Sequence, residues 1–108
     1  MSYEVRLLPE AMEDLARLHD YLLERELARE LARDGDPDYA DEAVNAIQAG
    51  VTMLGRTPFS CRKCAGSAFL RELVIPFGRT GYVALFEIVS STLVFVSAIR
   101  HQREDDYH

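Results

Sequence analysis

The hydrophobic and polar positions at the start of the chain first alternate and then repeat at helical spacing. Residues 2–7 alternate between polar and apolar side chains, which predicts a half-buried strand. From Pro9 the apolar positions recur at three- and four-residue intervals, which predicts an amphipathic helix that runs to about Arg33. A turn cluster that holds both a glycine and a proline follows, and the same spacing then predicts a second helix from about Tyr39 to Arg56.

The second half of the chain reads as strands. Residues 57–67 are predicted to form a loop, and three apolar runs follow it at 68–77, 82–89 and 93–99, separated by connections of hairpin length. The middle run is apolar on both faces, which indicates a central strand. The predicted fold class is α+β, in the order β-α-α-β-β-β: an N-terminal strand, a helical hairpin, and a three-stranded antiparallel meander.

Length and composition predict one soluble domain that spans residues 1–108. Hydrophobic residues make up 48% of the chain, which is sufficient for a packed core. No apolar run approaches the roughly 20 residues that span a bilayer. Glu4 and Arg6 interrupt the first apolar residues, where a secretion signal needs an unbroken run. We therefore expect a cytoplasmic protein that makes no contact with a membrane.

The net charge of −6 conceals a division between the two halves of the chain. Residues 1–55 carry five arginines against thirteen acidic residues, whereas residues 56–103 carry seven basic residues against only Glu72 and Glu87. The acidic total argues against broad coating of nucleic acid, whose affinity comes from phosphate neutralisation. The basic second half still permits contact with one focused anionic partner.

Cys61 and Cys64 have the spacing of half a zinc site. No second cysteine pair is present to complete it, although His101 or His108 could contribute a ligand. Two cysteines in a loop of a cytoplasmic protein are more often free thiols. We expect neither a metal nor another cofactor.

The most informative segment is the C-terminal run that follows the last predicted strand. It reads Ile99-Arg100-His101-Gln102-Arg103-Glu104-Asp105-Asp106-Tyr107-His108. Two arginines, a histidine and a tyrosine at the edge of a sheet are suited to grip phosphates or carboxylates. The three acidic residues of the same run could equally neutralise those arginines and leave a solvated tail.

This run, the order of elements and two shorter segments resemble the ParE/RelE superfamily of toxins from type II toxin–antitoxin, or plasmid stabilisation, systems. The shorter segments are Arg71-Glu72-Leu73 and Gly81-Tyr82-Val83. The Arg-His-x-Arg-x-x-x-Tyr ending is closer to the ParE branch, whose members poison DNA gyrase. Such a toxin uses a contact surface and no catalytic residue, and the resemblance assigns that surface to Arg71, Arg79, Arg100, His101 and Arg103.

Two alternatives to a gyrase poison remain open. The RelE branch cleaves mRNA on the ribosome, and its chemistry would fall on Arg71, Arg100, His101, Arg103 and Tyr107. That branch carries an arginine where this chain has Val83, which favours the ParE reading. A degenerate, non-toxic member that only binds its antitoxin is the third reading.

The resemblance also implies partners. A cognate antitoxin would wrap the toxin with a helix or a strand, using an apolar groove or an open sheet edge. A homodimer or a toxin–antitoxin heterotetramer is the expected assembly. DNA gyrase, or the ribosome with its mRNA, is the expected target.

Overall fold

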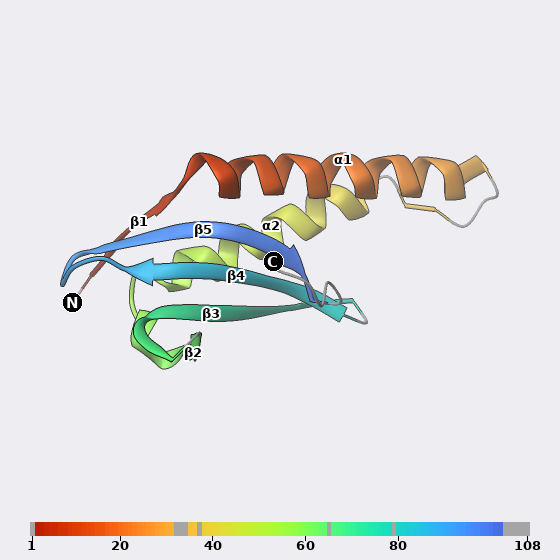
Figure 1. Cartoon of the computed structure of the whole chain (residues 1–108). Helices are drawn as coiled ribbons and strands as arrows, with labels where there is room; N and C mark the ends of the chain where they lie inside the picture. The colour runs from red at the N-terminus through yellow and green to blue at the C-terminus, as the bar shows by residue number, and fades with distance from the viewer. Residues whose placement is uncertain (1, 32–34, 37, 65, 79, 103–108) are drawn as a thin grey trace.

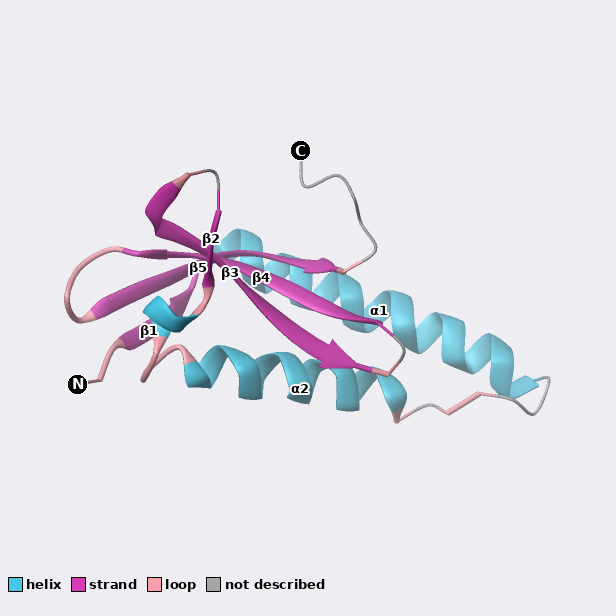
Figure 2. Cartoon of the chain, turned by 90° about the horizontal axis from the view of Figure 1, so that it is seen from below, coloured by secondary structure: helices cyan, strands magenta, loops and turns pink. Residues whose placement is uncertain are grey.

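Two helices cover one face of a five-stranded sheet in the computed structural model (Figure 1, Figure 2). The structure describes residues 2–31, 35–36, 38–64, 66–78 and 80–102. The elements in chain order are β1 (Glu4–Leu7), α1 (Pro9–Leu31), α2 (Tyr39–Met53), a 3-10 turn (Pro58–Ser60), β2 (Arg62–Cys64), β3 (Ser67–Phe77), β4 (Thr80–Ile88) and β5 (Leu93–His101).

The sheet has the strand order β1-β5-β4-β3-β2. The predicted antiparallel meander is present as β3, β4 and β5, but it is only part of the sheet. β2 adds an antiparallel strand at one edge, and β1 pairs in parallel with β5 at the other. The α+β class is therefore confirmed, and the three-stranded meander is corrected to the centre of a five-stranded mixed sheet.

The predicted loop at 57–67 contains β2, so the prediction was wrong there. The segment has no alternation of apolar and polar residues, which is the signal that identifies a strand in a sequence. It is held as a strand by partners that lie further along the chain. Arg62 pairs with Glu72 in the ladder, and the Arg62 Nε donates to the Glu72 carboxylate at 3.1 Å.

The two helices end differently from the prediction. α1 runs to Leu31, and the expected end at Arg33 lies outside the described residues. α2 ends at Met53, three residues before the predicted end at Arg56. The chain tightens there into bonds between residues three apart, since the N–H groups of residues 54, 55 and 56 bond to the carbonyls of residues 51, 52 and 53.

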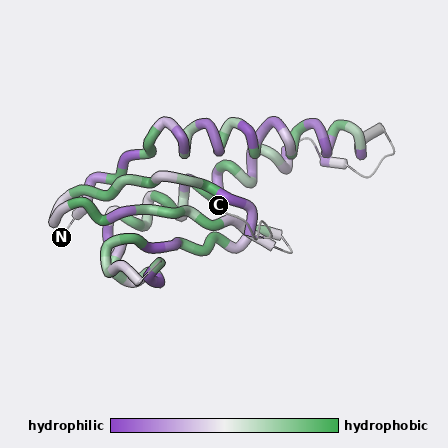
Figure 3. The backbone as a smooth tube through the Cα atoms, in the orientation of Figure 1, coloured by the Kyte–Doolittle hydropathy of each residue, from purple (hydrophilic) through white to green (hydrophobic). Residues whose placement is uncertain are grey.

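The core lies between the helices and the helix-facing side of β4. Tyr82, Ala84, Phe86 and Ile88 alternate along that side and are at most 4% exposed. The helices contribute a row of small and branched side chains to the same core: Ala11, Leu22, Ala40, Ala43, Ile47 and Val51. Figure 3 shows the contrast, with largely hydrophobic central strands and an α1 that alternates between hydrophilic and hydrophobic turns. No helix in the described part of the chain is long and apolar enough to span a membrane.

β1 is short, and its length determines where α1 meets the sheet. It pairs only with Leu93–Val96, the first half of β5. Leu8 adds one further backbone bond to the Val96 carbonyl, at 2.9 Å, and the chain then turns into α1 at Pro9. The second half of β5 therefore pairs with β4 on one side and, within the described residues, has no strand on the β1 side, where α1 runs along it instead (Figure 1).

Candidate functional site

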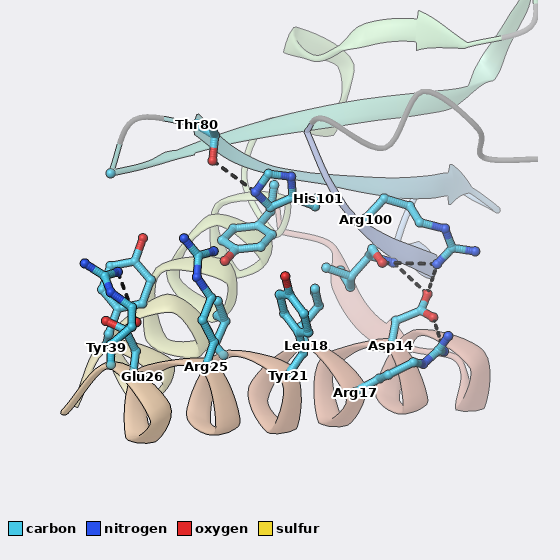
Figure 4. A pocket seen from close by; sticks show the side chains of 15 residues that line it. Asp14, Arg17, Leu18, Tyr21, Arg25, Glu26, Tyr39, Thr80, Arg100 and His101 are labelled. Atoms are coloured by element: carbon cyan, nitrogen blue, oxygen red, sulfur yellow. Dashed lines mark hydrogen bonds and ion pairs between the residues drawn. The ribbon is translucent and has the colours of Figure 1, made fainter. Parts of the chain in front are cut away.

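A groove of about 1250 Å³ lies between α1 and the ends of β4 and β5 (Figure 4). α1 supplies one wall, and Thr80, Arg100 and His101 stand on the other, with Tyr39 at the start of α2 closing one end. Pockets for small ligands hold roughly 300–1,000 Å³. The volume of this groove therefore suits a segment of a macromolecule better than a small molecule.

The α1 wall carries a row of side chains spaced four residues apart. Its members are Arg17, Tyr21, Arg25 and Arg29, all of which line the groove. Positions four apart fall on one face of a helix, so the row follows from sequence spacing alone. These arginines were not predicted as site residues because they lie in the acidic half of the chain, where the overall charge hides a basic face.

The opposite wall carries Arg100 and His101, two of the residues that the sequence assigned to target contact. They are the last residues of β5 and both line the groove. The Arg100 side chain is 28% exposed, and its Nη1 donates to the Asp14 carboxylate at 2.5 Å. The same nitrogen also donates to the Ile99 carbonyl at 3.1 Å, so Arg100 is held in one direction at the mouth of the groove.

Asp14 links the α1 wall of the groove to the β5 wall. It is 6% exposed, and its Oδ2 accepts both the Arg100 guanidinium and the backbone N–H of Ile99, the latter at 3.0 Å. Its Oδ1 accepts Arg17 at 2.6 Å. The carboxylate thus accepts from an edge N–H that no strand among the described residues reaches, and it pairs with one arginine from each wall.

Aromatic rings underlie the groove. Tyr39, Phe77, Tyr82 and His101 follow one another with ring centroids 5.0, 6.2 and 5.5 Å apart. The His101 Nε2 lies 3.1 Å from the Thr80 hydroxyl, as Figure 4 shows. Burial is the main cause that raises the pKa of the Tyr82 hydroxyl; nearby Tyr39 adds to the rise, and the Arg25 cation offsets part of it.

Arg71, a third residue assigned to target contact, lies elsewhere and is 8% exposed. Its guanidinium donates to three backbone carbonyls: Ala68 at 2.8 Å, Phe59 at 2.9 Å and Cys61 at 2.7 Å. It also lies over the Phe59 ring, 5.0 Å from the centroid. This geometry gives Arg71 a structural role, which is to hold the chain before β2 against β3.

Not all of the remaining predicted site residues lie in the part of the chain that the structure describes. Arg79, Arg103 and Tyr107 lie outside the described residues. Cys61 and Cys64 are free, half-buried thiols at the start and end of the β2 region, and burial raises the pKa of Cys61. Among the residues that the structure describes, no three His, Cys, Asp or Glu side chains are arranged to hold a metal ion.

Comparison with known proteins identifies the family. No curated protein matches the chain. A solved structure described as the chromosomal ParDE TA system from P. aeruginosa has a chain with the same fold: the TM-score is 0.68 at 18% identity, over 93% of this chain and 96% of that one. The family model for the ParE toxin of type II toxin–antitoxin systems, parDE, matches residues 5–106. Since that match covers nearly the whole chain, the protein belongs to the ParE toxin family of type II toxin–antitoxin systems.

Proposed function

We propose that this ParE-type toxin inhibits DNA gyrase through the groove surface that contains Arg100 and His101. Membership of the family implies an antitoxin as partner. In this proposal the cognate antitoxin neutralises the toxin in the cytoplasm, within a homodimer or a toxin–antitoxin heterotetramer. Arg100 suits the contact because its guanidinium is fixed by Asp14 yet remains partly exposed.

The observation that carries the proposal is the separation of the residues that would cleave RNA. Arg71 pairs in register with Phe86, whereas Arg100 and His101 pair with Val83 and Tyr82. Three or four residues along a strand correspond to about 10–13 Å. Arg71 is also buried, and its Nε and Nη1 donate to backbone carbonyls, so it is not positioned to stabilise charge at a phosphate shared with Arg100.

Val83 supports the same conclusion. The resemblance to the RNA-cleaving branch requires an arginine at this position of the third predicted strand. The side chain here is apolar and 1% exposed. A phosphoryl-transfer site needs cations aimed at one phosphorus atom, and neither Val83 nor Arg71 supplies one.

The test measures the effect of the purified chain on gyrase and on ribosome-bound mRNA. We expect gyrase supercoiling to be inhibited and cleaved DNA to accumulate, while the mRNA stays intact. Arg100→Ala should abolish the inhibition, whereas Arg62→Ala, which removes an exposed arginine on β2, should leave it unchanged. Circular dichroism must show both variants folded, and Arg100→Gln serves if the alanine variant does not fold.

Two outcomes would overturn the proposal. Cleavage of mRNA with unaffected gyrase would identify an endoribonuclease and make His101 the first residue to substitute. Silence of both assays, with tight binding to the antitoxin, would identify a member that has lost its toxicity.

A further inference from the structure

The groove has a chemistry that the proposed contact with gyrase does not by itself explain. We propose that it binds a single strand of nucleic acid, with phosphates on the arginines of α1 and a base stacked on Tyr21. This deepens the proposed function, because gyrase acts on DNA and a toxin that also holds a strand would contact enzyme and substrate together.

The groove has positive charge available to bind phosphates. Among the described residues that line the groove, two are carboxylates, and both are buried and paired: Asp14 with Arg17 and Arg100, and Glu26 with Arg29 at 3.3 Å. Arg25 is exposed and makes no hydrogen bond or ion pair within the described residues. The described part of the groove lining therefore carries more arginine than carboxylate, although the whole chain has a net charge of −6.

The arginines of α1 are spaced at whole turns along one face of the helix. Arg25 and Arg29 lie one turn apart on α1, and Arg17 lies two turns before Arg25, with a helical rise of about 6 Å for each four residues. A row of cations at this interval can follow a phosphate backbone, each meeting a different phosphate. Arg100 on the facing wall brings a further guanidinium to the same groove.

An exposed aromatic ring, that of Tyr21, lies between the arginines of α1. Tyr21 is 60% exposed and stands in the row between Arg17 and Arg25 (Figure 4). Basic residues interleaved with exposed aromatic rings are typical of proteins that bind single strands, since the bases stack while the cations follow the backbone. A buried packing role does not explain a ring that is mostly in solvent.

The groove favours a nucleic-acid strand over an acidic peptide because three of its apolar floor residues are buried, although Leu18 on α1 is half-buried and lines it too. Leu22, Tyr82 and Ile99 line it but are only 5%, 3% and 1% exposed. A bound peptide helix gains most of its affinity from apolar anchors that enter pockets. The exposed side chains of the α1 wall are arginines and Tyr21, which suit phosphates and bases.

The test is fluorescence anisotropy of the full chain with a labelled strand of about 12 nucleotides, within the site sizes known for single-strand binders. Arg25→Glu should weaken binding about tenfold or more, and Arg25→Ala should make the salt dependence shallower by about 0.7 in log–log slope. Tyr21→Ala should weaken binding about tenfold, while Tyr21→Phe should retain it. Thermal unfolding monitors the fold of every variant.

Arg56→Glu is the matched control. It makes the same change of charge at an exposed position beyond the end of α2, and it does not line the groove. Equal loss of binding in Arg25→Glu and Arg56→Glu would overturn the inference, because only overall charge would then matter. The absence of binding at low salt would overturn it as well.

Competition experiments with other ligands test which kind of molecule the groove binds. Strands of DNA and RNA with the same sequence compete for the groove, and a preference for either supports the shared chemistry and identifies its source. Equal binding of a duplex would contradict stacking on Tyr21, and displacement by a poly-glutamate peptide at lower concentration would assign the groove to a polypeptide. Since these measurements contain no gyrase, their failure is distinct from failure of the proposed gyrase inhibition.

Discussion

The carboxylate of Asp14 on α1 accepts a hydrogen bond from the backbone N–H of Ile99 on β5, across 85 positions of the chain. The same side chain pairs with Arg100 and Arg17, so one buried carboxylate fixes both the strand edge and the arginine that faces the groove. Structure and proposed activity therefore depend on the same residue.

Asp14→Ala should lower the free energy of unfolding by about 2–4 kcal/mol, because it leaves a backbone N–H and a guanidinium without their shared acceptor. Asp14→Asn retains an oxygen that can accept from Ile99, so its loss should be smaller. Urea unfolding followed by circular dichroism measures both. Asp20→Ala is the control, since that side chain is 78% exposed. A midpoint for Asp14→Ala equal to that of the wild type would contradict the assignment.

Arg71→Met should destabilise the fold by about 2–4 kcal/mol, because three carbonyls lose a charged donor. The Phe59 ring also loses its cation. Inhibition of gyrase by the folded fraction should be unchanged, since Arg71 does not line the groove. Chemical unfolding and a supercoiling assay on the same preparation check the two parts. Loss of inhibition with unchanged stability would return Arg71 to the contact surface.

Gly81→Ala should destabilise the β3–β4 hairpin by about 2 kcal/mol or more, because overpacking against backbone forces the strands apart. A Cβ at this position would lie 2.3 Å from the Ile75 carbonyl oxygen. Gly66→Ala provides the comparison, since a Cβ there meets nothing within 4 Å and only the positive φ of 74° opposes it. Thermal unfolding of the two variants should place Gly81→Ala well below Gly66→Ala.

Stability should fall at alkaline pH, in part through Tyr82. Its pKa is raised in the folded state, so the unfolded chain loses this proton first as the pH rises. The contribution is complete below the ordinary tyrosine pKa of about 10 and is lost as the pH passes through the raised value. Unfolding in urea at a series of pH values should show a shallower decline for Tyr82→Phe. An identical slope would mean that the hydroxyl titrates alike in both states.

The sequence predicted the elements best where their hydrophobic period is clear. β1 and the two helices follow such a period, and β3 to β5 were predicted from apolar runs of strand length. β2 has neither signal, since Arg62 and Lys63 are polar and the strand depends on bonds that Arg71 and Glu72 make to it. Long-range polar contacts of this kind leave no periodic trace in a sequence.

The site was predicted in part. Arg100 and His101 do lie together at the groove, because both end the strand that the sequence identified. Arg71 was placed with them because a sequence shows its charge but not its burial. The arginines of α1 were missed, although the four-residue interval that links Arg17, Tyr21, Arg25 and Arg29 was visible. Only the fold shows which face of that helix stays open.

The parallel pairing of β1 with β5 also bears on how the toxin is made. β1 is synthesised before the rest of the sheet, but its partner begins only at Leu93. Until then Asp14 lacks Ile99 and Arg100, and the groove lacks one wall. Pairings between distant segments form late. A chain whose translation stops before β5 therefore lacks one wall of the groove, and the proposed activity requires β5 to have been made.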